Sequence, residues 1–148
     1  MAAAIHVLAV TALGVYAGGT LTEGGVLVPW WRGLPPAEFL RWYAANHARI
    51  TRFFGALTAT AAVLAVVDAG VAVAGRDATR GWAVAAAVLM LALVAMFPLC
   101  FKTPNERFAS GGIAPDDVPA ALARWAAWHR LRMVASVVTV VVAARHAA

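Results

Sequence analysis

Four long apolar stretches limit what this chain can fold into. They are residues 4–21, 53–74, 82–101 and 131–144, and an amphipathic stretch at 120–128 lengthens the last one to about 125–144. A helix needs roughly 20 apolar residues, at about 1.5 Å each, to cross the hydrocarbon core of a bilayer. The stretches lack the period-two alternation of a membrane β-barrel. We therefore expect an all-α membrane protein, with residues 1–148 forming a single four-helix transmembrane bundle.

The composition agrees with an integral membrane protein and excludes other classes. Hydrophobic residues make up 63% of the chain and charged residues 13%, and the mean hydropathy is +0.77, which is too apolar for a water-facing surface. The net charge is +5, but no basic patch is interleaved with recognition aromatics, so no nucleic-acid partner is expected. A single cysteine, Cys100, excludes an internal disulfide. The first span lacks the basic segment of a signal peptide and is expected to be retained.

Arginine and lysine residues are distributed unevenly around the spans. Nine of the 12 lie around the first and third connections: Arg32, Arg41, Arg49, Arg52, Lys102, Arg107, Arg124, Arg130 and Arg132. Arg76, Arg80 and Arg145 lie on the opposite side. The positive-inside rule then predicts that the two long connections are cytoplasmic and that both termini lie outside. Because richness in Ala, Val and Arg is typical of a high-GC bacterial source, the expected location is a bacterial inner membrane.

The three connections differ in length and character. The second, "GRDATRG" (75–81), is a short turn. In the first (22–52), "GLPP" predicts a helix start, and no breaker follows, so helix two is expected to extend beyond the bilayer. The third (102–119) is expected to be a loop, with Pro98 bending the helix before it. Gly14-x-x-x-Gly18 would allow close packing of helix one, and leaves room for a homo-oligomer.

Polar and aromatic residues gather at the helix ends that share the cytoplasmic side. Such ends lie at one depth, and a four-helix bundle builds its sites from residues that face inward. Trp125, His129 and Arg132 are spaced i, i+4 and i+7, which places them on one helix face. Tyr43 and His47 share a face of helix two in the same way. The residues expected to converge also include Glu23, Lys102, Asn105, Glu106 and Trp128.

Several of these residues also have ordinary structural interpretations. Tryptophans beside a span are usually interfacial anchors, and arginines there usually reach lipid phosphates. The first interpretation applies to Trp30, Trp31 and Trp42, and the second to Arg49, Arg124 and Arg130. His6 and His146 are expected to be incidental, and Asp68 is expected to pair with Arg76 or Arg145. Arg132 lies deeper and needs a partner such as Glu106 or an anionic ligand.

Three short motifs suggest a family. Val28-Pro29 follows the first span, "TPNERF" (103–108) ends the third, and "WAAWHRLR" (125–132) opens the fourth. Together, over nearly the whole chain, they resemble the small four-helix membrane proteins of the DUF1772 or anthrone oxygenase-like family. The resemblance places the family's pattern on Asn105 and on Trp125, His129 and Arg132. It implies an oxidation of anthrones to anthraquinones, as characterised members carry out in aromatic polyketide pathways.

The residues are compatible with such an oxygenase without a cofactor. An anthrone C–H that is conjugated with the carbonyl is acidic enough for a positioned base, and the enolate reacts with dioxygen. We expect His129 as the base and His47 as a second base or ligand, since an unperturbed histidine titrates at about 6.5. Asn105, Lys102 or Arg132 could hold the oxyanion, and we expect Asn105 and Arg132 as the polar anchors. The residues expected to bind a lipophilic aromatic substrate are Trp125, Trp128, Tyr43 and Lys102.

Other functions remain open from the sequence. His47 and His129, with Glu23 or Glu106, would make a ligand set for iron or copper and a metal-dependent oxidoreductase. The same two histidines could hold a haem in an electron carrier, although their position at the interface is shallow for haem. A transport or accessory subunit is the other non-enzymatic alternative. No Gly-rich loop indicates a nucleotide, flavin or nicotinamide cofactor.

Overall fold

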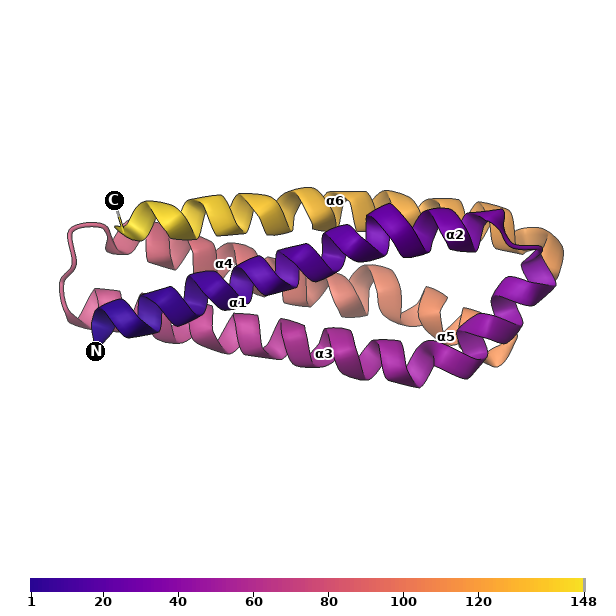
Figure 1. The fold of residues 1–148 in the computed structure, drawn as a ribbon, viewed down its shortest axis with the longest axis horizontal. Helices are drawn as coiled ribbons and strands as arrows, with labels where there is room; N and C mark the ends of the chain where they lie inside the picture. The colour runs from indigo at the N-terminus through magenta and orange to yellow at the C-terminus, as the bar shows by residue number, and fades with distance from the viewer. Residues whose placement is uncertain (148) are drawn as a thin grey trace.

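The computed structural model describes residues 1–147, and this part of the chain folds into helices and short turns without a strand (Figure 1). Helices run up and down the bundle in four rods joined by short connections. In chain order the elements are α1 (Ala2–Thr22), η1 (Glu23–Leu27), α2 (Val28–Gly33), α3 (Pro36–Ala74), α4 (Arg80–Met96), η2 (Phe97–Phe101), α5 (Lys102–Ser110), η3 (Pro115–Asp117), α6 (Val118–Ala144) and η4 (Arg145–Ala147).

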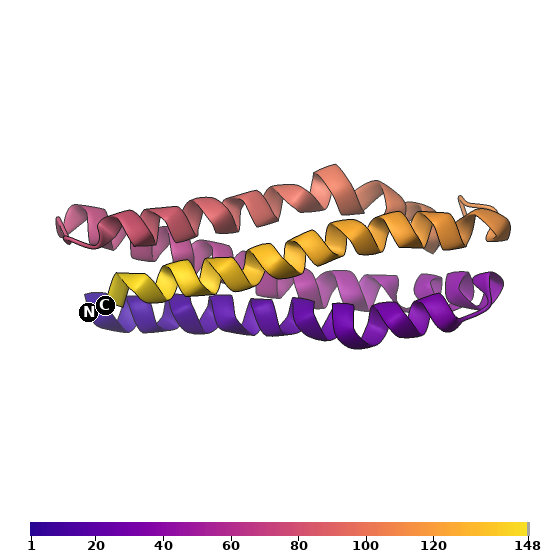
Figure 2. The same ribbon diagram turned by 90° about the horizontal axis from the view of Figure 1, so that it is seen from above.

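The rods are Ala2–Gly33, Pro36–Ala74, Arg80–Ser110 and Pro115–Ala144, with 32, 39, 31 and 30 residues, and all four are long and apolar enough to cross a membrane. The expected four-helix bundle is thereby confirmed. At about 1.5 Å per residue the rods measure roughly 45–60 Å, longer than a hydrocarbon core of about 30 Å. The second rod, α3, is the longest, in line with its expected extension, but the other three rods accompany it along its length (Figure 2). The extension is therefore a full layer of four helices.

The bundle contains two hydrophobic cores, one in each half of its length. The half that holds both termini, here the terminal half, is packed mainly with alanine, which lets helices approach closely. The opposite half, here the aromatic half, is packed around Trp31, Phe39, Tyr43, Phe108 and Trp125. The two halves also differ in the side chains that they expose at the surface. Side chains such as Val7, Val63 and Val134 are more than half exposed on the terminal half, whereas the exposed cations Arg32, Arg41, Arg49, Arg52, Lys102, Arg107, Arg124 and Arg130 surround the aromatic half.

The first and third connections are largely helical, which corrects the expectation of a loop at 102–119. The first connection breaks only between α2 and α3, after Gly33, because a π-helical turn, η1, absorbs Gly24 and Gly25 and leaves Pro29 in the first turn of α2. A proline in a first turn costs no backbone hydrogen bond. The predicted loop at 102–119 begins with helix α5, which ends at Gly111 in the left-handed conformation (φ 71°). Pro98 lies in a second π-helical turn, η2, in line with the expected bend.

Two further expectations concern packing. Trp31 is 1% exposed and lies at the centre of the aromatic core, in edge or tilted contact with four aromatic rings, so the interpretation as an interfacial anchor is wrong for this residue. Trp30, by contrast, is 43% exposed. A Cβ added at Gly14 or Gly18 would meet no atom within 4 Å. The small-residue motif is therefore not used for packing within this chain.

Candidate functional site

A layer of buried polar side chains lies where the two cores meet. Glu23, at the start of η1, is 3% exposed, and His129 of α6 is 1% exposed. Arg132 Nη2 lies 2.5 Å from Glu23 Oε2 and 2.6 Å from His129 Nδ1. The arginine therefore joins the first rod to the fourth. A buried charge pair of this kind persists only when hydrogen bonds satisfy its members.

The hydrogen bonds of His129 fix its protonation and tautomer. Its Nε2 lies 3.0 Å from the backbone oxygen of Thr20, which can only accept, so Nε2 carries the proton. Its Nδ1 faces Arg132 Nη2, which can only donate, so Nδ1 holds a lone pair. His129 is thus a neutral imidazole with both nitrogens engaged. It has no lone pair free for a substrate.

Helical spacing explains how the first rod supplies its part of the layer. Tyr16, Thr20 and Glu23 are spaced i, i+4 and i+7, the spacing that also aligns Trp125, His129 and Arg132 on α6. The two faces meet, and Thr20 Oγ1 lies 3.0 Å from Ser136 Oγ one turn beyond Arg132. Sequence reasoning missed Tyr16, Thr20 and Ser136. The same spacing test on the first span would have found the first two.

Aromatic rings enclose the charged layer on the side of the aromatic half. The Trp125 ring stacks on His129 with an interplanar angle of 14° and a centroid distance of 5.1 Å. The Arg132 guanidinium lies over Phe101 at 4.4 Å and over Phe54 at 6.0 Å. Such cation–π contacts stabilise a partly desolvated cation. The rings therefore help to hold Arg132 in place.

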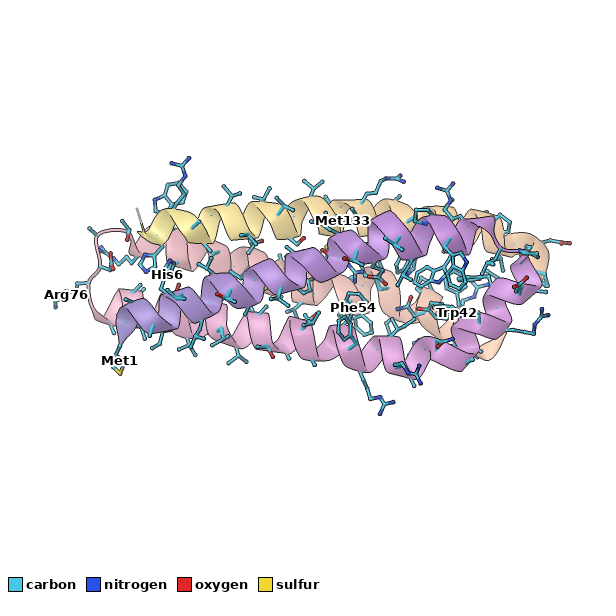
Figure 3. The ribbon with its side chains drawn as sticks, in the orientation of Figure 1. Met1, His6, Trp42, Phe54, Arg76 and Met133 are labelled. Atoms are coloured by element: carbon cyan, nitrogen blue, oxygen red, sulfur yellow. The ribbon has the colours of Figure 1, made fainter. Side chains whose placement is uncertain are left out.

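A cavity of about 570 Å³ reaches this layer. Its walls are mostly apolar side chains of α3 and α4, and Phe54 projects from α3 about midway along the bundle (Figure 3). Lining residues that are exposed, such as Gly55 and Ala59 on α3 and Leu91 and Ala95 on α4, place the mouth of the cavity between these two helices. The volume is typical of pockets for small organic ligands.

The inner end of the cavity is polar. Glu23, Asn105 and Arg132 line it together with Tyr16 and Tyr43. Asn105 Oδ1 accepts a hydrogen bond from Trp125 Nε1 at 2.8 Å, which orients the amide and leaves its NH₂ group as a donor for a ligand. Within residues 1–147, the hydrogen bonds to Glu23 side-chain oxygens use Oε2, so Oε1 is left to accept. The site thus combines a carboxylate oxygen with several donors at the end of an apolar chamber.

The structure brings together part of the predicted set. Tyr43, Asn105, Trp125 and Arg132 line the cavity, and Glu23 joins them. The partner of Arg132 is Glu23; the expected partner, Glu106, is exposed on α5.

The other predicted substrate residues lie elsewhere. Trp128 is 47% exposed, Lys102 is exposed, and neither lines the cavity. His47 packs beside Tyr43, outside the cavity lining, with its Nδ1 buried and without a hydrogen-bond partner in the described residues.

The predicted metal set is not assembled. Among the described residues, the group of His, Cys, Asp or Glu close enough to hold a metal ion contains neither His47, His129, Glu23 nor Glu106. His129 is also unsuited to a haem iron, because its Nε2–H is bonded to Thr20 and its Nδ1 to Arg132. The predicted joint metal site of His47 and His129 is therefore not formed, and the hydrogen bonds of His129 correct its assignment as a haem ligand.

The group that does come together lies at the other end of the bundle. It consists of His6, Asp68 and His146. Asp68 is therefore not paired with Arg76 or Arg145 as expected, since its Oδ2 lies 3.0 Å from His6 Nδ1. His6 and His146 are not incidental in their placement either, because their rings meet edge to face.

The fold and the site define a class of molecule: a four-helix bundle of membrane-spanning length with a side-opening apolar cavity that ends at a buried Glu–Arg–His layer. No family model, curated protein or solved structure matches the chain.

Proposed function

We propose that this protein is a membrane-embedded oxygenase that acts on a lipophilic aromatic molecule bearing an acidic C–H that is conjugated with a carbonyl through the ring system. The observation that carries the proposal is the shape and lining of the cavity. Its walls are mostly apolar, and Glu23, Asn105 and Arg132 form its polar inner end. An apolar ligand fits the walls, and a carbonyl oxygen at its leading edge would meet the donors. The resemblance to anthrone oxygenase-like proteins favours oxidation as the reaction.

Entry from the bilayer suits this cavity. The mouth lies between α3 and α4, whose neighbouring surface residues Val63 and Leu91 are 61% and 49% exposed. Apolar exposed side chains on a helix of spanning length face lipid. A poorly soluble substrate would therefore pass from lipid into the protein without crossing water.

Glu23 is the residue best placed to act as the base. His129 donates from Nε2 and accepts at Nδ1, so the proton acceptor proposed from the sequence is replaced by the free Oε1 of Glu23. Arg132 orients the carboxylate through Oε2, and His129 orients Arg132. His129 thus acts as a positioning residue.

The reaction balances with dioxygen as the co-substrate. Glu23 takes one proton from the substrate carbon, and the electron pair moves onto the carbonyl oxygen, where the Asn105 amide donates to the enolate. The enolate carbon then bonds to dioxygen, Glu23 returns its proton to the resulting peroxide, and loss of water leaves a second carbonyl. One CH₂ group and one O₂ become one C=O group and one H₂O. Donors aimed at such an oxyanion typically contribute about 100-fold or more to the rate.

Oxygen uptake by the protein in nanodiscs with anthrone tests this proposal. Glu23→Gln keeps the shape of the side chain but removes the base, so we expect uptake to fall about 100-fold or more, the usual contribution of a general base. Glu38→Gln makes the same change at an exposed glutamate in the first turn of α3 and should leave uptake unchanged. Protein-free nanodiscs give the rate of spontaneous oxidation.

Two results would overturn the proposal. One is a wild-type rate no higher than that of protein-free nanodiscs. The other is full activity in Glu23→Gln. Quenching of tryptophan fluorescence by the ligand, measured in parallel, reports whether binding survives in the variant, because Trp125 lines the cavity.

A further inference from the structure

We propose that His6, Asp68 and His146 form a binding site for a divalent transition-metal ion of the zinc class, at the end of the bundle opposite the cavity. The three come from separate elements, α1, α3 and η4, and one ligand atom from each lies within 4.8 Å of the others. Figure 3 places His6 at the same end of the bundle as Met1 and Arg76. His6 and Glu23 are separated by 17 residues of the first rod, about 25 Å along a helix. The proposal is therefore independent of the proposed function.

The geometry is close to that of a coordination sphere. Zinc binds histidine nitrogen and carboxylate oxygen at roughly 2.0–2.2 Å, which puts neighbouring ligand atoms about 3.4 Å apart. His6 Nδ1 and Asp68 Oδ2 are 3.0 Å apart, and the rings of His6 and His146 meet at a centroid distance of 4.7 Å. Small side-chain rotations would bring all three atoms onto one ion. The His6 and Asp68 side chains are only 12% and 7% exposed, so their positions are restricted by packing.

Thr79 orients the His146 side chain through hydrogen bonds. The Thr79 hydroxyl lies 2.8 Å from Asp77 Oδ1, 2.8 Å from the His146 carbonyl oxygen and 2.9 Å from His146 Nδ1. Hydrogen bonds from Thr79 lower the pKa of the Asp77 carboxyl, which keeps it an acceptor. The hydroxyl has one proton, which it donates to one of these two oxygens. It therefore accepts a hydrogen bond from Nδ1–H of His146. The Nε2 lone pair is then free, the usual state of a histidine whose other nitrogen is held by a second partner.

The ligand chemistry selects the metal. Two imidazoles and one carboxylate suit Zn²⁺, Co²⁺, Ni²⁺, Cu²⁺ or Fe²⁺, whereas Mg²⁺ and Ca²⁺ prefer oxygen ligands. Three protein ligands leave a zinc-class ion with an open coordination position. The ion would also tie together the ends of the first, second and fourth rods.

Titration of tag-free, detergent-purified protein with Co²⁺ tests the site, because the visible absorption of bound Co²⁺ reports nitrogen and oxygen ligation. We expect one Co²⁺ per chain, displaced by Zn²⁺. His6→Gln, Asp68→Asn and His146→Gln should each weaken binding at least 10-fold, and Thr79→Val should weaken it about 10-fold through His146. His47→Gln is the matched control and should bind as wild type does. His146→Gln, at the end of the last rod, keeps the test valid should His6→Gln fail to fold.

Three outcomes would overturn the proposal. These are the absence of Co²⁺ absorption in the wild type, binding that survives His146→Gln and Asp68→Asn unchanged, and loss of binding in His47→Gln. The last would place the metal in the aromatic half. Thermal unfolding of the metal-free variants distinguishes loss of ligands from loss of fold.

Discussion

Arg132 is the residue that joins the polar layer to its surroundings. Its guanidinium donates to Glu23 and His129 and lies over the Phe101 ring, while its side chain is only 12% exposed. The sequence predicted that Arg132 shares a face with His129 and Trp125, because helical spacing alone decides this. It did not predict Glu23 as the partner in place of Glu106. The sequence predicts a similar depth for both glutamates, and only the three-dimensional packing of the rods distinguishes them.

Arg132→Met should destabilise the protein strongly, because it leaves Glu23 buried without its countercharge. The expected loss is about 3–5 kcal/mol, the usual cost of removing one partner of a buried ion pair. Unfolding in mixed micelles measures it. Arg130→Met, two residues earlier and exposed, is the control and should change stability by no more than about 0.5 kcal/mol.

The double variant Glu23→Gln with Arg132→Met separates the ion pair from simple packing. Removing both charges also removes the unpaired carboxylate, so most of the lost stability should return. A double variant as unstable as Arg132→Met would contradict the importance of the charge pair.

At the scale of elements, the π-helical turns η1 and η2 explain most differences between prediction and structure. Glycine pairs and prolines ordinarily end helices, and "EGGVLVP" and "FPLCFKTP" were therefore expected near helix ends. In the structure a wider turn takes up one extra residue, and the helix continues into the next element. The four spans were predictable from the length of the apolar stretches, and the extension of the second rod, α3, was predictable from the "GLPP" helix start. The π-turns depend on packing against other rods, which no local pattern reports.

Gly24 and Gly25 test how tightly η1 packs against α6. A Cβ at Gly24 would clash with Met133 Sδ and would lie 2.9 Å from Met133 Cε and 3.0 Å from His129 Nε2, whereas a Cβ at Gly25 would meet nothing within 4 Å. Met133 is flexible, but His129 is held by Thr20. Gly24→Ala should therefore cost about 1 kcal/mol through overpacking, and Gly25→Ala should be neutral or stabilising by up to about 1 kcal/mol. Equal effects on the unfolding free energy would refute this difference.

At the scale of the whole molecule, the charge distribution predicts an orientation. The aromatic half carries nine of the 12 cations, against Arg76, Arg80 and Arg145 on the terminal half, and within residues 1–147 only Arg132 of the nine pairs with a buried carboxylate. The positive-inside rule therefore still predicts that this half is cytoplasmic and that both termini lie outside. In this orientation the His6–Asp68–His146 site would lie on the outer side.

Cysteine labelling in a Cys100→Ser background tests the orientation. Ala78→Cys lies in the turn before α4, and Ser110→Cys lies at the end of α5, and both positions are exposed. A membrane-impermeant maleimide added to intact spheroplasts should label position 78. Position 110 should react only after lysis, and the opposite pattern would reverse the topology.

The side opening between α3 and α4 has a kinetic consequence under the proposed function. For a substrate that enters from lipid, the effective concentration is its mole fraction in the bilayer. An apparent KM expressed per volume of water therefore has no fixed value, because it changes with the amount of lipid. Empty vesicles added at constant total substrate would lower the mole fraction of substrate in the bilayer and so slow turnover. Dilution of the whole sample with buffer, at a constant ratio of lipid to substrate, would leave the turnover per protein molecule unchanged.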